Sequence, residues 1–333
     1  MATKSVLVTG GAGYIGSHTA LALMAAGWQP VIVDTLATGR RELVPTGVTF
    51  VHGDAGDGEL VGRLLRRHDC RYVLHFAGST VVPESVTEPL KYYRNNTGVS
   101  RNLLATCIEA AVKGFIFSST AAVFGNPEKL PVSETTPTVP ITPYGTSKLM
   151  TEWMLRDVAA VNPLTYVALR YFNVAGADPA GRIGQSTPKA TLLTKVACEV
   201  VVGKREYVSI YGTDYATPDG TGVRDYIHVE DLASAHLKAL TYLRRGGKST
   251  TLNCGYGRGY SVRELITMVE AVAGHEIAKR EAPRRAGDPP SLVAQAKRIR
   301  QVLGWQPQHD DLEKIVSTSL AWERKLAAGH WRS

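Results

Sequence analysis

Short runs of apolar residues alternate with longer stretches of mixed polarity through the first half of the chain. The runs end in polar or turn residues, as buried strands do, and the stretches between them have the length of helices. This alternation favours a parallel sheet with helices on both faces, so we expect an α/β fold. The predicted strands cover residues 5–9, 30–34, 72–76, 114–118 and 166–170, and the predicted helices cover residues 14–26, 57–67, 89–111 and 144–160.

The alternation loosens beyond about residue 174, where glycine, proline and threonine become more frequent up to Gly222. We therefore expect a first domain over residues 1–173 and a smaller second region over residues 174–333. A chain of 333 residues is long enough for two modest domains.

Composition and charge narrow the function. With 44% hydrophobic and 20% charged residues and no long apolar run, the chain is expected neither to span nor to bind a membrane. The net charge of +8 comes from scattered lysines and arginines, which argues against nucleic acid and suggests an anionic ligand such as a diphosphate. The four cysteines lack metal-site spacing, so we expect no metal site and reduced, mostly buried thiols in a cytoplasmic protein: Cys70, Cys107, Cys198 and Cys254.

A glycine triplet follows the first predicted strand and opens the first predicted helix. Gly10, Gly13 and Gly16 would let the backbone approach a pyrophosphate, which the positive end of the helix attracts. Asp34 ends the second strand, where a carboxylate can accept hydrogen bonds from ribose hydroxyls. The combination predicts a dinucleotide site.

Three further residues bear on the cofactor. Arg40 and Arg41 could hold the 2′-phosphate of NADP, but Asp34 would repel that phosphate, so we expect NAD. Asp54 follows the third strand, where it either lies beside the adenine or caps a helix.

A tyrosine and a lysine four residues apart suggest proton transfer. Tyr144 and Lys148 would lie on one face of a helix, and an ammonium favours the phenolate of a phenol whose pKa is ordinarily about 10. Thr120 stands at the end of the predicted strand that begins at residue 114, where its hydroxyl could bridge the tyrosine and a reacting alcohol or simply cap a turn. We expect the three to form a catalytic triad.

Taken together, these motifs resemble the UDP-glucose 4-epimerase family of the extended short-chain dehydrogenase/reductase superfamily. The Arg-Asp-Tyr-Ile-His sequence within 219–229 is the most diagnostic for enzymes of sugar nucleotides. The resemblance spans essentially the whole chain, through the segments 9–18, 75–78, 143–148, 169–173, 219–229, 253–255, 283–290 and 303–305.

The resemblance implies a Rossmann-like, doubly wound sheet that binds NAD tightly and regenerates it in each turnover. The first domain would be the NAD-binding domain, joined by residues 224–256, and residues 174–333 would be the UDP-sugar-binding domain. It implies cofactor contacts from Gly10, Gly13, Tyr14, Ile15, Gly16, Asp34, Asp54, Ala55, Phe76, Ala77, Gly78, Asn95, Ser118, Tyr144, Lys148 and Tyr171. It implies substrate contacts from Thr120, Tyr144, Asn173, Arg224, Tyr226, Arg285, Asp288 and Leu292.

Three positions depart from the family's best-known pattern. Thr80, after Ser79, stands where many members have a lysine, and Leu192 where an asparagine or histidine is expected. Leu292 replaces a residue beside the sugar's C2 substituent. The sugar therefore stays open between UDP-galactose, which we favour, and an N-acetylhexosamine, uronate or pentose.

Two rival functions share the fold. A 4,6-dehydratase would need an acid and a base where this chain has Ala121 and Ala122. A non-catalytic NAD-sensing regulator would be expected to lose Tyr144 or Lys148, and both are present. The resemblance also implies a homodimer that forms through the helices at 89–111 and 144–160.

Overall fold

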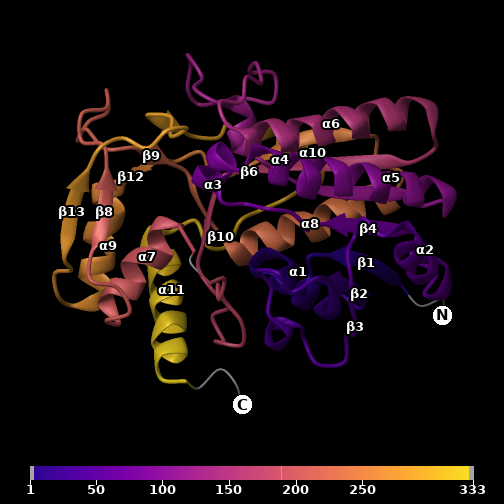
Figure 1. The fold of residues 1–333 in the computed structure, drawn as a ribbon, viewed down its shortest axis with the longest axis horizontal. Coiled ribbons are helices and arrows are strands. Elements are labelled where there is room, and N and C mark those ends of the chain that lie inside the picture. Colours follow the sequence, from indigo (N-terminus) through magenta and orange to yellow (C-terminus); the bar gives the residue numbers. More distant parts are fainter. Residues whose placement is uncertain (1–3, 189, 330–333) are drawn as a thin grey trace.

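The centre of the molecule is a seven-stranded parallel sheet (Figure 1) in the computed structural model, which describes residues 4–188 and 190–329. The strand order is β11-β6-β5-β4-β1-β2-β3. The order reverses between β1 and β4, which is where open α/β sheets bind ligands. The strands are β1 (Ser5–Thr9), β2 (Gln29–Asp34), β3 (Thr49–His52), β4 (Tyr72–His75), β5 (Gly114–Thr120), β6 (Thr165–Tyr171) and β11 (Thr250–Cys254).

Alternating side chains divide the core between the two faces of this sheet. Val6 and Val8 of β1 pack with the first helix, whereas Leu7 joins the cluster that holds Leu103 and Leu155 on the other face. Helices α1 (Tyr14–Ala25), α8 (Val229–Arg244) and α10 (Lys297–Leu303) cover one face. Helices α2 (Gly58–Arg67), α5 (Val99–Glu109) and α6 (Pro143–Val161) cover the other. The expected doubly wound α/β class is confirmed.

The prediction of a single helix over residues 89–111 is wrong in its middle. Helix α4 (Pro89–Tyr92) and α5 are joined by a π-helical segment, η2 (Tyr93–Gly98). Asn96 explains the change, because its side chain bonds both backbone groups of Ser79 and the Ser147 hydroxyl. Such π segments occur frequently at functional sites. The other predicted elements match the structure to within two residues at each end.

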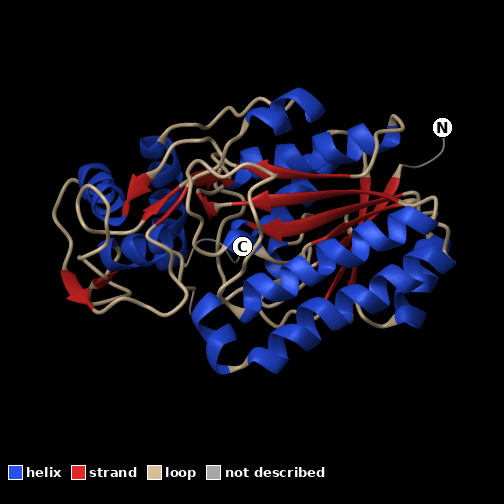
Figure 2. Ribbon diagram, turned by 90° about the horizontal axis from the view of Figure 1, so that it is seen from above, coloured by secondary structure: helices blue, strands red, loops and turns tan. Residues whose placement is uncertain are grey.

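A smaller region lies beyond the carboxyl ends of the central strands, toward which the arrowheads point in Figure 2. Its short strands form three small sheets, β7–β10, β8–β13 and β12–β9–β14. They are β7 (Asn173–Ala175), β8 (Val208–Tyr211), β9 (Val223–Arg224), β10 (Tyr226–His228), β12 (Tyr260–Ser261), β13 (Lys279–Ala282) and β14 (Ser291–Leu292). The helices are α7 (Leu193–Val201), α9 (Val262–Ala273) and α11 (Leu312–Ala327).

The remaining elements are short turns of helix. They are η1 (Arg41–Leu43), α3 (Val82–Thr87) and η3 (Ala121–Phe124). No helix within residues 4–188 and 190–329 is long and apolar enough to cross a membrane. The four cysteines are buried free thiols, as expected.

Candidate active site

The glycine loop packs so closely against neighbouring backbone that side chains would not fit at two of its positions. Gly10 has φ +69°, and a Cβ there would lie 2.6 Å from the Ala77 nitrogen. A Cβ on Gly16 would lie 2.3 Å from the Gly10 carbonyl oxygen. Gly13 precedes α1 and supplies no capping side chain, so the first N–H groups of this helix can face an anion. The loop therefore fits the pyrophosphate of a dinucleotide.

Asp34 is fixed against this loop. Its carboxylate accepts hydrogen bonds from the Ala12 nitrogen at 2.9 Å and from the Leu36 nitrogen at 2.8 Å. A carboxylate has about four acceptor positions, so two remain for ribose hydroxyls. Arg40 donates to the Ser186 carbonyl oxygen, and the Arg41 guanidinium lies over the Phe50 ring. Both arginines thus have structural contacts, and the arrangement favours NAD over NADP.

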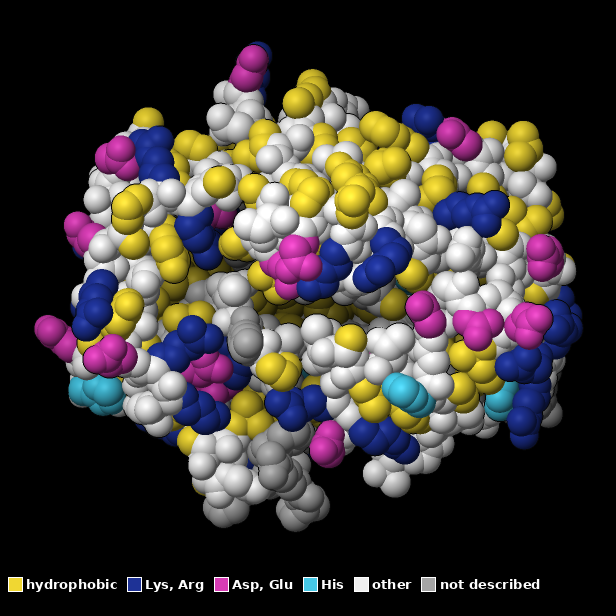
Figure 3. Space-filling view, in the orientation of Figure 1, with side chains coloured by type: hydrophobic (Ala, Val, Ile, Leu, Met, Phe, Trp, Pro, Cys, Tyr) yellow, Lys and Arg dark blue, Asp and Glu magenta, His cyan; other side chains and the backbone are white. Residues whose placement is uncertain are grey.

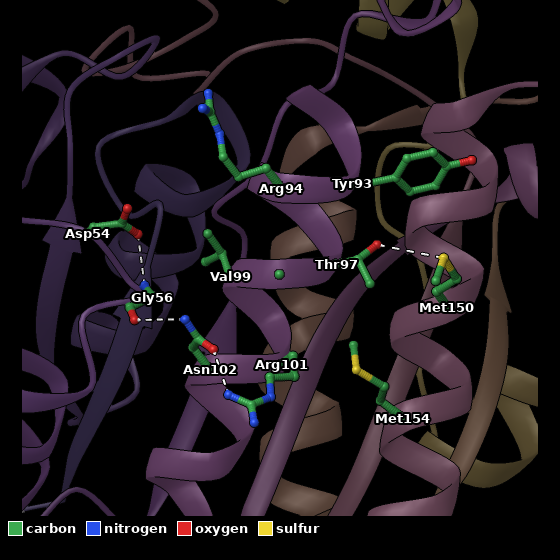
Figure 4. Close-up of a pocket in the computed structure, with 11 residues that line it drawn as sticks. Asp54, Gly56, Tyr93, Arg94, Thr97, Val99, Arg101, Asn102, Met150 and Met154 are labelled. Atoms are coloured by element: carbon green, nitrogen blue, oxygen red, sulfur yellow. Dashed lines mark hydrogen bonds between the residues drawn. The ribbon is translucent and has the colours of Figure 1, made fainter. Parts of the chain in front are cut away.

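Asp54 does not cap a helix. Its carboxylate accepts from the Gly56 nitrogen at 2.7 Å, and α2 is capped by Asp57, which accepts from the Leu60 nitrogen. The alternative of a cap is therefore wrong for Asp54. Figure 4 shows Asp54 at the edge of a hollow of about 570 Å³ beside α5 and α6, and Ala55 next to it is buried.

The three predicted catalytic residues lie together at the carboxyl end of β5. Thr120 hydrogen-bonds to Tyr144, and its hydroxyl also accepts from the Ala122 nitrogen at 3.1 Å. The interpretation of Thr120 as a cap is thus confirmed, because it caps η3, and its role in bridging a reacting alcohol stays a prediction. The Lys148 ammonium donates to the Ser118 carbonyl oxygen at 3.1 Å. Tyr144 lies in the first turn of α6, and all three side chains are buried.

Burial controls the protonation of this cluster. It raises the pKa of Tyr144, which the hydrogen bond from Thr120 opposes, and it lowers the pKa of Lys148 to about 8. Burial thus outweighs the expected lowering of the tyrosine pKa. The phenol needs additional positive charge beside it before it can act as a base near neutral pH.

Two of the predicted cofactor residues, Tyr171 and Asn95, are each hydrogen-bonded to a serine. The Ser118 hydroxyl donates to the Tyr171 hydroxyl at 2.9 Å, and Asn95 donates to the Ser79 hydroxyl. A Cβ on Gly78 would lie 2.8 Å from the Asn96 Oδ1. These residues lie at the carboxyl ends of β4, β5 and β6 and on the segment η2.

Three other predicted cofactor residues have their side chains fixed by contacts within the protein. The Phe76 ring packs against the His236 ring of α8, with centroids 4.7 Å apart. The Tyr14 hydroxyl donates to the Gly176 carbonyl oxygen at 2.6 Å, and Ile15 packs against the core. Tyr14 therefore ties α1 to the smaller region.

The predicted substrate residues come from two paired strands and the segment before them. Arg224 of β9 is paired with Leu292 of β14, and Arg224 donates to the Val223 carbonyl oxygen. Arg285 and Asp288 form an ion pair at 2.9 Å. Burial lowers the pKa of Arg224, and the nearby Asp288 carboxylate opposes this.

Three other substrate candidates are placed by backbone pairing or burial. Asn173 and Tyr226 lie opposite each other on β7 and β10, and burial raises the pKa of Tyr226 to about 12. Leu292 lies in an apolar cluster with Phe124 and Phe172. Its side chain is thus packed within the protein.

A family model described as the NAD dependent epimerase/dehydratase family matches residues 6–255, which is most of the chain. The chain belongs to this family. It is 59% identical to UDP-glucose 4-epimerase from Azospirillum brasilense over 98% of this chain and 93% of that protein.

Two solved structures of the same fold are similar over nearly their whole length. One is UDP-glucose 4-epimerase from Bifidobacterium longum in complex with NAD+ and UDP, with a TM-score of 0.92, 40% identity and coverage of 96% of this chain and 98% of that one. The other is the UDP-Glc/GlcNAc 4-epimerase from the human pathogen Campylobacter jejuni, with a TM-score of 0.84, 46% identity and coverage of 97% and 99%.

Within this epimerase/dehydratase chain, sequence reasoning missed several residues of the site. The Tyr92 ring packs edge-on against Tyr144 with centroids 6.3 Å apart, and Asn96 anchors the loop after β4. The buried Tyr215 hydroxyl, which has no hydrogen-bond partner among the described residues, lies near Arg224. Two consecutive asparagines inside a predicted helix were the available signal, because asparagine is a poor helix former.

The structure also places Thr80 and Leu192, two of the positions that depart from the family's best-known pattern. Thr80 is exposed, and Leu192 is the partly buried residue before α7. Neither position carries a charge. No group of three or more His, Cys, Asp or Glu residues within 4–188 and 190–329 is arranged to hold a metal ion.

Proposed function

We propose that this chain is an NAD-dependent 4-epimerase that interconverts UDP-galactose and UDP-glucose through a transient 4-keto sugar. The observation that carries the proposal is the buried cluster of Thr120, Tyr144 and Lys148 beside the glycine loop. The name of the Azospirillum brasilense relative, which is similar over almost the whole chain, supports the same reaction.

The glycine loop and Asp34 would hold the cofactor. The close-packed loop of Gly10, Gly13 and Gly16 would present the uncapped start of α1 to the pyrophosphate, and Asp34 has acceptor positions left for the adenosine ribose. When bound, NAD supplies the acceptor and later the donor of the hydride at C4 of the sugar. The Bifidobacterium longum structure, which is a complex with NAD+ and UDP, supports this cofactor.

Tyr144 would move the proton. It takes the proton of the C4 hydroxyl with Thr120 as a bridge, and it returns the proton after the sugar has turned. Lys148 supplies positive charge from the same face of α6. Burial raises the pKa of Tyr144 even with Lys148 in place, so the positively charged ring of oxidised NAD would have to supply further charge for the phenolate to form.

Arg224 and Arg285 would anchor the diphosphate while the 4-keto sugar rotates. Guanidinium groups suit phosphate oxygens, and the Arg285 side chain is partly exposed next to Asp288. Tyr226 and Asp288 would face the uridine. Because the nucleotide would stay bound while the sugar turns, either face of C4 could be presented to the cofactor.

Elimination of water is disfavoured by the residues after Thr120. A 4,6-dehydratase needs an acid and a base there, and η3 begins with Ala121 and Ala122. The regulator hypothesis is disfavoured by the presence of Tyr144 and Lys148 in contact with β5.

Which UDP-sugars the site accepts is also proposed here, from the position of Leu292. Leu292 lies in one apolar cluster with Phe124 and Phe172, so its side chain offers no polar contact. We favour hexoses without a C2 amide. The name of the Campylobacter jejuni protein, which includes GlcNAc, makes the N-acetylated sugar the first alternative to test.

A homodimer through α5 and α6 is supported by their outer surfaces. Met150 and Met154 of α6 face the hollow near Thr97 in Figure 4, and Trp153 and Ile108 are exposed. Hydrophobic side chains gather over α6 in Figure 3. Such patches mark protein contacts. The buried free thiols are consistent with the reducing cytoplasm, which we propose as the location.

The experiment is to incubate the purified protein with UDP-galactose, without added NAD, and to follow the anomeric protons by NMR. Formation of UDP-glucose supports both the 4-epimerisation and a retained cofactor. If nothing forms, NAD is added, followed by the N-acetylated, uronate and pentose analogues. Inactivity with all of them would reject the proposal in favour of the regulator.

A further inference from the structure

A buried ion pair lies directly behind the proposed catalytic cluster. Glu152 of α6 and Arg170 of β6 are joined by hydrogen bonds of 2.6, 3.0 and 3.2 Å, and their side chains are only 6% and 8% exposed. The Ser119 hydroxyl donates to the same carboxylate at 2.5 Å. None of these residues is among the expected cofactor or substrate contacts.

Each member of this network is a close neighbour of a residue in the catalytic cluster. Ser119 precedes Thr120, and Arg170 precedes Tyr171. Glu152 follows Lys148 by one turn of α6, so both side chains lie on one face of the helix. Ser119 and Arg170 are directly paired across β5 and β6, as are Thr120 and Tyr171 one residue further on.

The network is also tied to the segment that precedes α6. The Arg170 guanidinium lies over the Phe124 ring at 5.0 Å and reaches the Glu134 carbonyl oxygen at 3.5 Å. The Glu134 carboxylate in turn accepts from the Asn253 nitrogen of β11. The ion pair therefore connects one helix, three strands and the loop over residues 125–142.

We propose that Glu152 and Arg170 are positioning residues for this active site: their ion pair fixes α6 against β5 and β6 and thereby sets where Tyr144 and Lys148 lie. The inference rests on the proposed function, because it concerns the same reaction. Apolar side chains alone would let a helix slide or rotate on a sheet, whereas a bidentate Arg–carboxylate pair has one favourable geometry. This fixed geometry would explain why the protein buries the two charges of Glu152 and Arg170 despite the cost of removing them from water.

The test compares Glu152→Gln with a matched change elsewhere. Glu152→Gln keeps the shape of the side chain and removes its charge. The control is Glu323→Gln, which removes the charge from a similarly buried pair, Lys195 with Glu323, between α7 and α11. Both variants should lose stability, because each removes a carboxylate from a buried cation; in the control, Lys195 keeps its second partner, Glu199.

Only Glu152→Gln should change the chemistry. We expect kcat to fall by about 10- to 100-fold, as for a small misplacement of reacting groups, with KM within about threefold of wild type. Bound NAD per chain should be unchanged. The control should keep kcat within about twofold, since its pair does not touch the cluster.

A spectroscopic titration gives a readout that does not depend on turnover. The tyrosinate absorbance of each protein minus that of its Tyr144→Phe counterpart isolates Tyr144, which is faced by Lys148 of its own helix, Tyr92 of α4 and Tyr171 of β6. If Glu152→Gln moves Lys148 away, the titration should shift to higher pH. The titration in Glu323→Gln should match wild type.

Two outcomes would overturn the inference. One is a Glu152→Gln protein that melts lower but keeps the wild-type kcat and titration; the other is an equal loss of kcat in Glu323→Gln. If Glu152→Gln does not fold, Glu152→Asp and Arg170→Lys take its place. These variants keep the charges but change the geometry of the pair, so each must lower kcat, by less than is expected for Glu152→Gln. A wild type inactive on every sugar would reject the proposed function, and the titration shift alone would then decide the positioning role.

Discussion

The proposed catalytic cluster and the proposed diphosphate contacts are built differently. Around Tyr144, the polar groups are buried and engaged with the protein, as in the contact of Lys148 with Ser118. Around Arg285, the charged groups are partly exposed and pair with each other: the Arg285 and Asp288 side chains are 33% and 22% exposed. The first region is arranged before any ligand binds, whereas the second must exchange internal partners for the ligand.

This difference predicts how substitutions divide between kcat and KM. Changes in the preformed cluster should lower kcat, because its contacts act in the transition state. Changes among the exchangeable charges should raise KM, because those contacts hold substrate and transition state alike.

Replacing Tyr144 with Phe should have the largest effect. The hydroxyl that accepts the proton is lost, so we expect kcat to fall by about 1000-fold or more, in the range for general acid–base groups. The ring stays edge-on to Tyr92, and the glycine loop is untouched. Bound NAD, released by denaturing the protein and measured by absorbance, should equal that of wild type. Full activity in this variant would remove the basis of the mechanism.

Replacing Arg285 with Met should act on the other side of the comparison. Loss of a charged contact to the diphosphate is expected to raise KM by about 10- to 100-fold, with kcat within about threefold. The control is Arg280→Met, because Arg280 lies over the Tyr207 ring at 3.9 Å much as Arg285 lies over the Tyr211 ring at 4.5 Å. Steady-state kinetics with UDP-galactose separate the two constants. A fall in kcat alone would place Arg285 in the preformed cluster instead.

The same contrast explains what the sequence could predict. Helix α6 was predictable within a residue because local signals define its start: Thr142 caps it and Pro143 is its first residue. Thr120 ends strand β5, and Tyr144 and Lys148 lie on α6, the long helix that follows it, so their proximity followed from the fold class. The substrate side offers no such rule, because β9 and β14 are two residues each and far apart in the chain.

Two failures show where local rules stop. Asn96 diverts the helix over 89–111 because its amide bonds backbone that comes seventeen residues earlier, at Ser79. The pair of Glu152 and Arg170 was invisible because each residue alone looks like a surface charge. Both depend on contacts between distant segments, which periodicity does not report.

Replacing Asp34 with Asn should weaken the cofactor site moderately. Asparagine keeps one acceptor oxygen, so it can accept only one of the two hydrogen bonds that Asp34 receives, from Ala12 and from Leu36. We expect retained NAD to bind about 10-fold more weakly, measured by refilling cofactor-stripped protein. Asp54→Asn is the matched control, since Asp54 receives one backbone bond, from Gly56, and should change affinity by about twofold. Equal effects of the two changes would contradict the leading role of Asp34.

The smallest effect is expected at the junction of the two regions, where stability should respond without catalysis. Burial and the neighbouring Asp178 carboxylate raise the pKa of Glu230 from 4.5 to about 7. Burial acts to raise the pKa of Asp178 as well, but hydrogen bonds from Arg182 outweigh it and lower that pKa to about 2. Asp178 therefore stays ionised above about pH 5, and Glu230 is the group that titrates.

The sign follows from the raised pKa. The folded protein holds the Glu230 proton more tightly than the unfolded chain, so this stability is fully present below pH 4.5 and is lost as the pH rises through 7. Glu230→Gln stays neutral and should melt about 2–4 °C higher than wild type at about pH 8, with little difference at about pH 5. His309, 3.8 Å from Glu230, has a pKa lowered by burial and is therefore uncharged at the higher pH. If Glu230→Gln instead melted lower than wild type at about pH 8, the ionised Glu230 carboxylate would be stabilised by Arg182. The charges at the junction would then pair with one another, as Arg285 and Asp288 do.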